Sequence, residues 1–209
     1  MILVNHQKQE IMDSIHYAKR IQMAILPPPE YISKHTKSCF ILYRPKDIVS
    51  GDFYWIEMIG NRLFFSAVDC TGHGVPGAFM SIVGNNGLDR ATREQRCVHP
   101  AEILDLLDDF VVETLRQTNK TEVKDGMDIA LCSYDITENI LEFAGANNPL
   151  YIIREKPGTL EINGIKYSPY LENEKFSLYE VKGDKQPIGA VDSRKKFTNN
   201  IIKIGRAHV

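Results

Sequence analysis

The sequence predicts an α+β protein whose sheets are built from antiparallel strands. The chain has 209 residues, which is enough to bury the core of one large domain or of two small ones. Two helical segments lie between an early strand pair and a later series of short strands, without the regular strand–helix alternation of a parallel sheet. Turn residues separate the later strands, which is typical of an antiparallel meander.

The composition excludes several classes of protein. With 43% apolar and 25% charged residues, the chain has the composition of a globular protein. The net charge of -2 and the absence of basic blocks argue against nucleic-acid binding. No signal peptide and no apolar run of membrane-spanning length occur, so we expect a cytoplasmic location without membrane insertion. The cysteines form no Cys-x-x-Cys pair and are expected to be reduced thiols: Cys39, Cys70, Cys97 and Cys132.

Residues 1–26 are expected to form an N-terminal signalling or linker helix. The pattern is helical from about Gln7 to Leu26, with five positions at the alternating four- and three-residue steps of a coiled coil, and Pro27 to Pro29 end it. Two interpretations stay open, because about two heptads are fewer than the ~3–4 that identify a coiled coil. The helix packs on its own domain, or it descends from an upstream sensor and pairs with its copy in a homodimer. The spaced positions are Ile11, Ile15, Ala18, Gln22 and Ile25.

A hairpin predicted over residues 52–69 brings two carboxylates together. Asp52 opens an aromatic-rich strand, Gly60-Asn61 turns the chain, and Asp69 ends the returning strand. Antiparallel pairing places both acids at the same end of the sheet, where they repel each other unless a divalent cation lies between them. Each acid alone is explained as a turn or capping residue, but together they favour a metal site, with the Cys70 carbonyl as a further ligand.

Glycines 72, 74 and 77 also spell a dinucleotide-binding fingerprint after a strand. That site needs a parallel strand after the first helix, with an acidic residue at its end. Asp89 has the right spacing but lies within a helical run, and a second helix follows. We therefore reject dinucleotide binding.

The remaining elements follow from periodicity. A strand is predicted at Cys39–Tyr43, and helices are predicted at residues 77–95 and from Pro100 onward. Asp105, Asp108 and Asp109 lie mostly off the apolar face of the second helix and are expected to face solvent. Further strands are predicted at residues 127–135, 140–146, 150–154, 160–167, 176–181 and 196–204.

Three other side chains are candidates with open alternatives. Arg44 has the planar fork of donors that binds phosphate, although a surface role is equally compatible. His73 fits a general acid, but a histidine that fixes the glycine turn by hydrogen bonding is the favoured interpretation. Asp128 precedes an apolar strand and is expected to cap a turn.

Several motifs resemble the SpoIIE/RsbU-type PP2C-like serine phosphatases. Residues 50–54, Ser-Gly-Asp-Phe-Tyr, resemble the Gly-Gly-Asp-Phe-Tyr motif of that family. Residues 69–78 are similar to its Asp-Val-Ser-Gly-His-Gly-Val-Pro-Ala-Ala motif. Residues 125–127, 144–149 and 186–189 match later motifs in the right order, and the helix ending at Leu26 resembles the family's entry helix.

The resemblance implies a metal-dependent phosphatase of phosphoserine or phosphothreonine in a regulatory protein, such as an anti-sigma-factor antagonist. It implies a four-layer α-β-β-α sandwich of two antiparallel sheets flanked by helices. Two Mn²⁺ or Mg²⁺ ions would activate water. By position, Asp52, Asp69 and the Cys70 carbonyl would hold metal, and Arg44 would bind the substrate phosphate.

The C-terminal end departs from the family pattern. Family members continue with a Thr-Asp-Gly segment and an Asp-Asp pair that supply further metal ligands and the last strands. We therefore expect residues 38–203 to form a partial phosphatase domain and residues 204–209 to be a non-native tail. The missing ligands leave a second possibility, a non-catalytic PP2C-like interaction module.

Overall fold

The computed structural model describes residues 2–117, 125–189 and 194–204. Its helices are α1 (Ile2–Ile25), α2 (Pro29–His35), α3 (Gly74–Asp89), a π-helical turn η1 (Arg90–Glu94) and α4 (Pro100–Thr114). Its strands are β1 (Phe53–Ile59), β2 (Arg62–Cys70), β3 (Met127–Asp135), β4 (Ile140–Ala146), β5 (Leu150–Glu155), β6 (Leu160–Ile162), β7 (Ile165–Tyr167), β8 (Leu171–Glu172), β9 (Phe176–Val181) and β10 (Asn200–Lys203).

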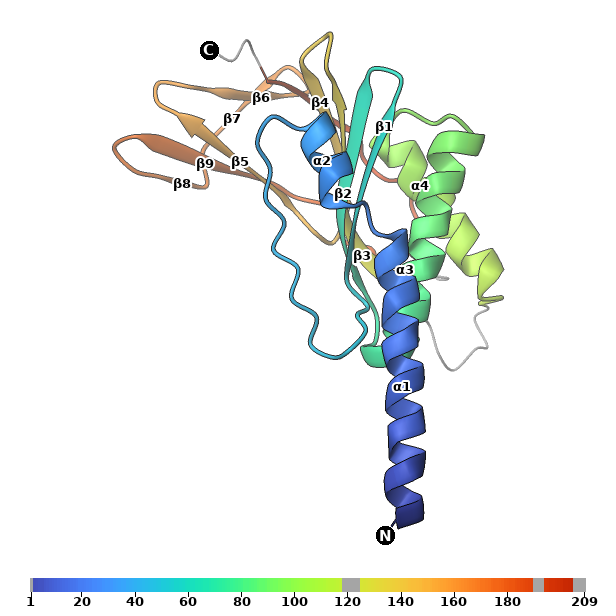
Figure 1. The fold of residues 1–209 in the computed structure, drawn as a ribbon. Coiled ribbons are helices and arrows are strands. Elements are labelled where there is room, and N and C mark those ends of the chain that lie inside the picture. The colour runs from blue at the N-terminus through green and yellow to red at the C-terminus, as the bar shows by residue number, and fades with distance from the viewer. Residues whose placement is uncertain (1, 118–124, 190–193, 205–209) are drawn as a thin grey trace.

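The strands form two antiparallel sheets, which confirms the predicted α+β class. The larger sheet has the order β1-β2-β3-β4-β10-β6-β7, and the smaller has the order β5-β9-β8. Helices α3 and α4 lie on one face of the larger sheet, together with the end of α1 (Figure 1). The smaller sheet packs against part of the opposite face.

Strand alternation divides the apolar side chains between two cores. On β1, Phe53 and Trp55 face the helices, where they join a core that includes Leu104 and Leu107 of α4. The opposite face of the larger sheet contributes Cys132 to a second core, with Tyr179 of the smaller sheet. Successive side chains of a strand point to opposite faces of the sheet, so neighbouring residues enter different cores. It places Asp52 and Asp69 on the sheet face away from the helices.

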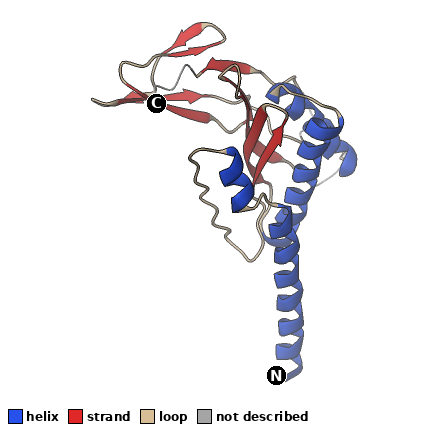
Figure 2. Cartoon of the chain, turned by 45° about the horizontal axis from the view of Figure 1, so that its top comes forward, coloured by secondary structure: helices blue, strands red, loops and turns tan. Residues whose placement is uncertain are grey.

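Helix α1 packs on the domain only through its C-terminal turns. Gln22 is 3% exposed, whereas Ile11 is 60% exposed. Figure 2 shows the N-terminal part of α1 projecting away from the sheets. The C-terminal end of α1 therefore packs on its own domain, as the first interpretation predicts. Contact of the projecting part with an upstream sensor or with a second copy of the chain stays a prediction.

Within the described ranges, none of the helices has both the length and the hydropathy needed to cross a membrane.

The predicted strand at Cys39–Tyr43 is wrong. The segment is not helical or strand-like in its hydrogen bonding, and Phe40 is 91% exposed. Residues with high strand propensity form a strand only where a neighbouring strand accepts their backbone hydrogen bonds. No strand in the described part of the chain pairs with this segment.

The predicted solvent exposure of the α4 carboxylates is also wrong for Asp108. Asp108 is 7% exposed and accepts a hydrogen bond from the Gly189 amide at 2.7 Å. Burial raises the pKa of Asp108, although Arg194 pairs with its other oxygen at 3.0 Å. The neighbouring Asp105 accepts from the Phe197 amide at 3.1 Å. Carboxylates beside the apolar face thus supply acceptors for backbone groups that have no strand partner.

A buried polar cluster around Glu142 on β4 predicts a pH dependence. Burial works against ionisation, but hydrogen bonds from Arg62, His99 and Asn199 outweigh it and lower the pKa of Glu142. A carboxyl with a lowered pKa contributes its full stabilisation above its ordinary pKa of about 4.3, and this contribution is lost progressively as the pH falls from there through the lower, folded-state pKa.

We therefore expect Glu142→Gln to lower the free energy of unfolding by about 1–3 kcal/mol at pH 7, because it removes the charged acceptor of the part-buried Arg62 guanidinium and of the other donors. Urea unfolding at pH 7 and pH 4 measures this. The difference between wild type and variant should shrink at pH 4. An equal difference at both pH values would contradict the assignment.

Candidate active site

Three acidic side chains form a row across neighbouring strands at one end of the larger sheet. Asp52 directly precedes β1, whose first residue, Phe53, pairs with Val68. Asp69 on β2 pairs with Asp128 on β3. Directly opposed residues of antiparallel strands point to the same face. Asp52, Asp69 and Asp128 therefore lie side by side on the face away from α3 and α4.

Asp52 and Asp69 interact directly. The pKa of Asp69 is raised, first by burial and then by a hydrogen bond to Asp52 and by the negative charge of Asp52. Two carboxyl groups this close cannot both ionise without a cost in free energy, and a cation between them removes that cost. The hairpin thus brings the two acids together as its register predicts.

Closely packed glycines bring together the loop before Asp52 and the turn after Asp69. A Cβ atom on Gly51 would lie 2.8 Å from the Gly72 carbonyl oxygen and 3.2 Å from the Cys70 carbonyl oxygen. A Cβ atom on Gly77 would lie 2.9 Å from the Gly51 Cα atom. Only a residue without a side chain fits at Gly51. The loop before Asp52 is therefore packed on the turn after Asp69.

Cys70 contributes backbone rather than thiol chemistry. Its side chain is buried, and burial raises the pKa of the thiol, with smaller contributions from the charges of Asp52 and Asp69. A thiol held in its neutral form is neither a nucleophile nor a metal ligand at neutral pH. Its carbonyl oxygen, beside Gly51, remains the candidate ligand.

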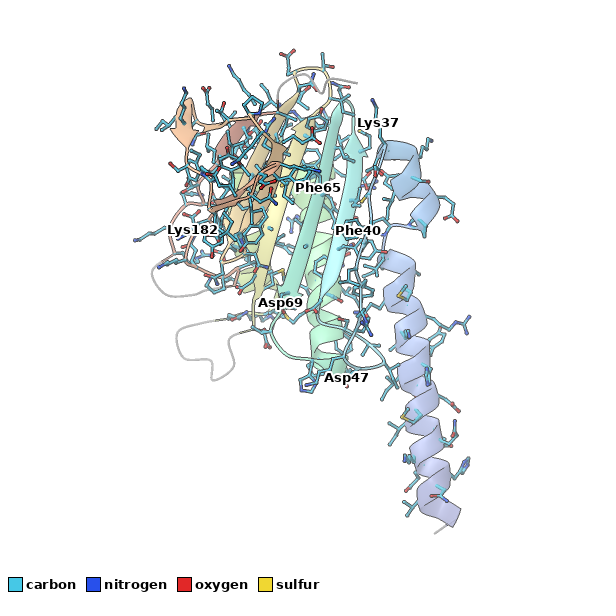
Figure 3. All side chains as sticks on the ribbon, turned by 90° about the vertical axis from the view of Figure 1, so that its left-hand side faces the viewer. Lys37, Phe40, Asp47, Phe65, Asp69 and Lys182 are labelled. Atoms are coloured by element: carbon cyan, nitrogen blue, oxygen red, sulfur yellow. The ribbon has the colours of Figure 1, made fainter. Side chains whose placement is uncertain are left out.

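His73 ties two loops of the site together. Its Nδ1 atom lies 2.9 Å from Oδ2 of Asp47, in the loop that leads to Asp52. His73 is also the N-cap residue of α3. Figure 3 shows Asp47 and Asp69 at the same end of the sheet. The contact fits the interpretation that His73 fixes the turn. The sequence analysis did not identify Asp47 as a site residue. The available signal was its position in the loop before Asp52, because its partner His73 is distant in the sequence.

Arg44 and the acid pair line one groove. The groove encloses about 910 Å³ between the segment that follows α2 and the sheet face, and Arg44, Asp52 and Asp69 contribute to its walls. Apolar side chains, among them Tyr54 and Phe65, line the rest. Arg44 is exposed, so its guanidinium can approach an anion from solvent.

Asp128 is not a simple turn cap. It is the second residue of β3, and its Oδ1 atom accepts a hydrogen bond from Nδ2 of Asn147 at 2.7 Å. The strand register that opposes it to Asp69 depends on a pairing between distant segments. Local sequence patterns do not reveal such a pairing.

Two carboxylates fit one hard divalent cation, which commonly binds through one or two carboxylates and several waters. In residues 2–117, 125–189 and 194–204, no group of three or more His, Cys, Asp or Glu side chains is arranged to hold a metal ion. An ion at the Asp52–Asp69 pair and a second ion beside it both stay predictions.

The structure does not support a dinucleotide site. Asp89 accepts a hydrogen bond from the indole nitrogen of Trp55 at 2.9 Å. Helix α3 is followed by η1 and α4, and every named strand pair in the described part is antiparallel.

Comparison with known proteins bears on the family and the fold of the chain. The family "Stage II sporulation protein E (SpoIIE)" matches residues 59–171. Among solved structures, the SiaA-PP2C domain of Pseudomonas aeruginosa is 29% identical, with a TM-score of 0.71. That match covers 94% of this chain and 68% of the other chain.

A second solved structure shows likeness of fold alone. It contains the RsbU and RsbW domains of Rv1364c from Mycobacterium tuberculosis, with 19% identity and a TM-score of 0.51. The match covers 75% of this chain but only 36% of the other chain. Comparison with curated proteins gives no significant match.

Proposed function

The chain belongs to the SpoIIE family of PP2C-type phosphatase domains, and from this premise we propose that it is a metal-dependent protein phosphatase. Its substrate would be phosphoserine or phosphothreonine in a regulatory protein, such as an anti-sigma-factor antagonist. The domain would act in the cytoplasm as the output domain of a bacterial signalling protein, with α1 leading from an upstream sensor.

The observation that carries this proposal is the contact between Asp52 and Asp69 at the end of β1 and β2. Burial raises the pKa of Asp69, and the hydrogen bond to Asp52 and the negative charge of Asp52 raise it further. A divalent cation would offset the electrostatic cost of holding two ionised carboxylates side by side. The same pair lines a groove open to a phosphorylated side chain.

Each residue has a distinct part in the proposed reaction. Asp52, Asp69 and the Cys70 carbonyl would hold Mn²⁺ or Mg²⁺, oxygen-seeking cations that suit these donors. A bound divalent cation supplies Lewis-acid chemistry toward a phosphoryl oxygen. Arg44 would bind the remaining phosphate oxygens through its fork of donors. The His73–Asp47 contact would keep the glycine turn in place.

Hydrolysis of an aryl phosphate and of a phosphoserine peptide, with and without Mn²⁺, tests the proposal. We expect hydrolysis that depends on Mn²⁺ and is lost with a chelator. The alternative is a non-catalytic interaction module, which the lack of a third clustered ligand among the described residues favours. Mn²⁺ binding without any hydrolysis would support that alternative.

Arg44→Ala should raise the KM for an aryl phosphate by about 10- to 100-fold, since a hydrogen bond to a charged group contributes about 1.5–3 kcal/mol. The Mn²⁺ affinity should stay unchanged, because Arg44 is not among the proposed ligands. Lys46→Ala removes a neighbouring exposed cation and serves as the control. Equal effects of the two variants on KM would show a general charge effect and contradict the phosphate role.

A further inference from the structure

Three exposed lysines lie close together in the segment that follows β9. Lys182 comes directly after β9, and Lys185 lies in the same loop. Lys195 is brought to this loop by Gln186, whose side chain accepts from the Lys195 amide at 3.1 Å and donates to the Lys195 carbonyl at 2.7 Å. We refer to Lys182, Lys185 and Lys195 as the lysine cluster.

Hydrogen bonds place the loop of the lysine cluster next to the row of acids. The Asp184 amide donates to the Gly145 carbonyl, and the Asn147 amide donates to the Asp184 carbonyl, both at 2.8 Å. The side chain of Asn147 in turn donates to Asp128 at 2.7 Å. Asp128 opposes Asp69 in the register of β2 and β3. The lysine cluster therefore lies at the rim of the proposed active site, on the side of Asp128.

The carboxylates around the lysine cluster do not neutralise it. Arg194 and Lys196, in the same segment, pair with carboxylates of α4 at 3.0 and 3.2 Å. Within the described residues, no ion pair joins a lysine of the cluster to a carboxylate. Asp184 lies between two of these lysines in sequence, but it accepts from the amide and the hydroxyl of Thr198 at 2.7 and 3.0 Å. The loop therefore carries an excess of positive charge toward solvent.

The lysine cluster and the acid pair present opposite charges at neighbouring places. Figure 3 shows Lys182 beside the smaller sheet and Asp69 at the end of the larger sheet. The carboxylates suit a metal ion, whereas the lysines attract anionic groups. The Debye length is about 8 Å at physiological ionic strength, so the lysines act mainly on groups that come close to this rim. When a phosphorylated side chain reaches the acid pair, the residues next to it come close to the lysine cluster.

We propose that the lysine cluster binds acidic side chains that flank the phosphorylated residue of the substrate. The preferred substrate is then phosphoserine or phosphothreonine within an acidic segment of a protein. This inference rests on the proposed phosphatase function. An ammonium group on a flexible stem pairs with a carboxylate without one fixed geometry. The cluster therefore selects for negative charge near the phosphate rather than for one sequence.

Two phosphoserine peptides that differ only in carrying Glu or Gln on both sides of the phosphoserine test the proposal. We expect the wild type to give a kcat/KM about 10-fold higher for the Glu peptide, since each exposed ion pair contributes up to about 5-fold. Lys182→Gln combined with Lys185→Gln should reduce this preference to about 2-fold or less. The wild-type preference should also shrink at about 1 M NaCl, where the Debye length is about 3 Å.

Lys166→Gln combined with Lys175→Gln is the matched control. Lys175 directly precedes β9, at the opposite end of the strand from Lys182, and Lys166 lies on β7. This control removes the same charge from exposed positions away from the acid pair, so the preference for the Glu peptide should stay at the wild-type value. Equal losses in the two double variants would overturn the proposal. Binding of the lysine cluster to vesicles that contain phosphatidylserine, without a preference between the peptides, would also overturn it.

Failure of the proposed function gives a different result. A wild-type protein that hydrolyses both peptides equally well remains a phosphatase and overturns the inference. If the wild type hydrolyses no phosphate ester, the fluorescence anisotropy of the two labelled peptides decides the binding role. Tighter binding of the Glu peptide that is lost in the Lys182 and Lys185 double variant supports the inference, and equal affinities overturn it.

Discussion

Asp69→Asn is expected to lower Mn²⁺-dependent hydrolysis of an aryl phosphate by about 100-fold or more. Replacing a residue that only orients a metal ligand commonly lowers metal affinity or activity 10–100-fold. Loss of a charged ligand should therefore lower activity by at least the upper end of that range. Asparagine keeps the shape of the side chain and removes one of the two charges. Initial rates across a series of Mn²⁺ concentrations measure the effect, with Asp13→Asn on the exposed part of α1 as the control.

The same substitution should not destabilise the metal-free protein. The pKa of Asp69 is raised, first by burial and then by Asp52, so the folded chain holds this proton more tightly than the unfolded chain. Stability is therefore lost as the pH rises from about 3.9 through the raised pKa, and asparagine avoids this loss at pH 7. A lowered Tm without metal, together with retained hydrolysis, would contradict the assignment of Asp69 as a ligand.

Gly51→Ala is expected to reduce both stability and Mn²⁺ affinity. The added methyl group would lie 2.8 Å from the Gly72 carbonyl oxygen, which is too close for an unstrained contact. Overpacking of this kind typically costs about 1–3 kcal/mol. Because the clash is with backbone, the loop before Asp52 must move away from the turn after Asp69. Urea unfolding and Mn²⁺ titration measure the two effects.

Gly60→Ala separates the site effect from a general glycine effect. Gly60 lies in the β1–β2 turn with φ of +59°, and a Cβ atom there would have nothing within 4 Å. Its substitution should cost about 1–2 kcal/mol through backbone strain alone and leave Mn²⁺ affinity unchanged. Unchanged affinity in Gly51→Ala as well would show that the packed glycines do not position the acid pair.

Much of the fold follows from local patterns in the sequence. The predicted strand at residues 127–135 matches β3, and the predicted strand at residues 176–181 matches β9. Both are bounded by turn residues, so local propensity and position agree. The Asp52–Asp69 pair was also predictable, because a short hairpin fixes which residues lie at the same end of its strands.

Contacts between distant segments were not predictable. Cys39–Tyr43 has the composition of a strand, but strand formation depends on a neighbour that no local pattern specifies. The burial of Asp108 depends on where the Gly189 amide lies in the folded chain. Gln22 is polar and shares only the spacing of the apolar positions on its helix, so its burial follows from hydrogen bonds to Ser50 and Ser81, which lie far away in the sequence.

The central claim is that Asp52 and Asp69 together bind a divalent cation. A ligand that binds only the folded state at 100 times its Kd stabilises that state by about 2.7 kcal/mol. Mn²⁺ should therefore raise the Tm of the wild-type protein by several degrees, in proportion to the logarithm of its concentration. Asp52→Asn combined with Asp69→Asn should remove this rise. A wild-type Tm that does not respond to Mn²⁺, or an equal rise in the double variant, would contradict the account.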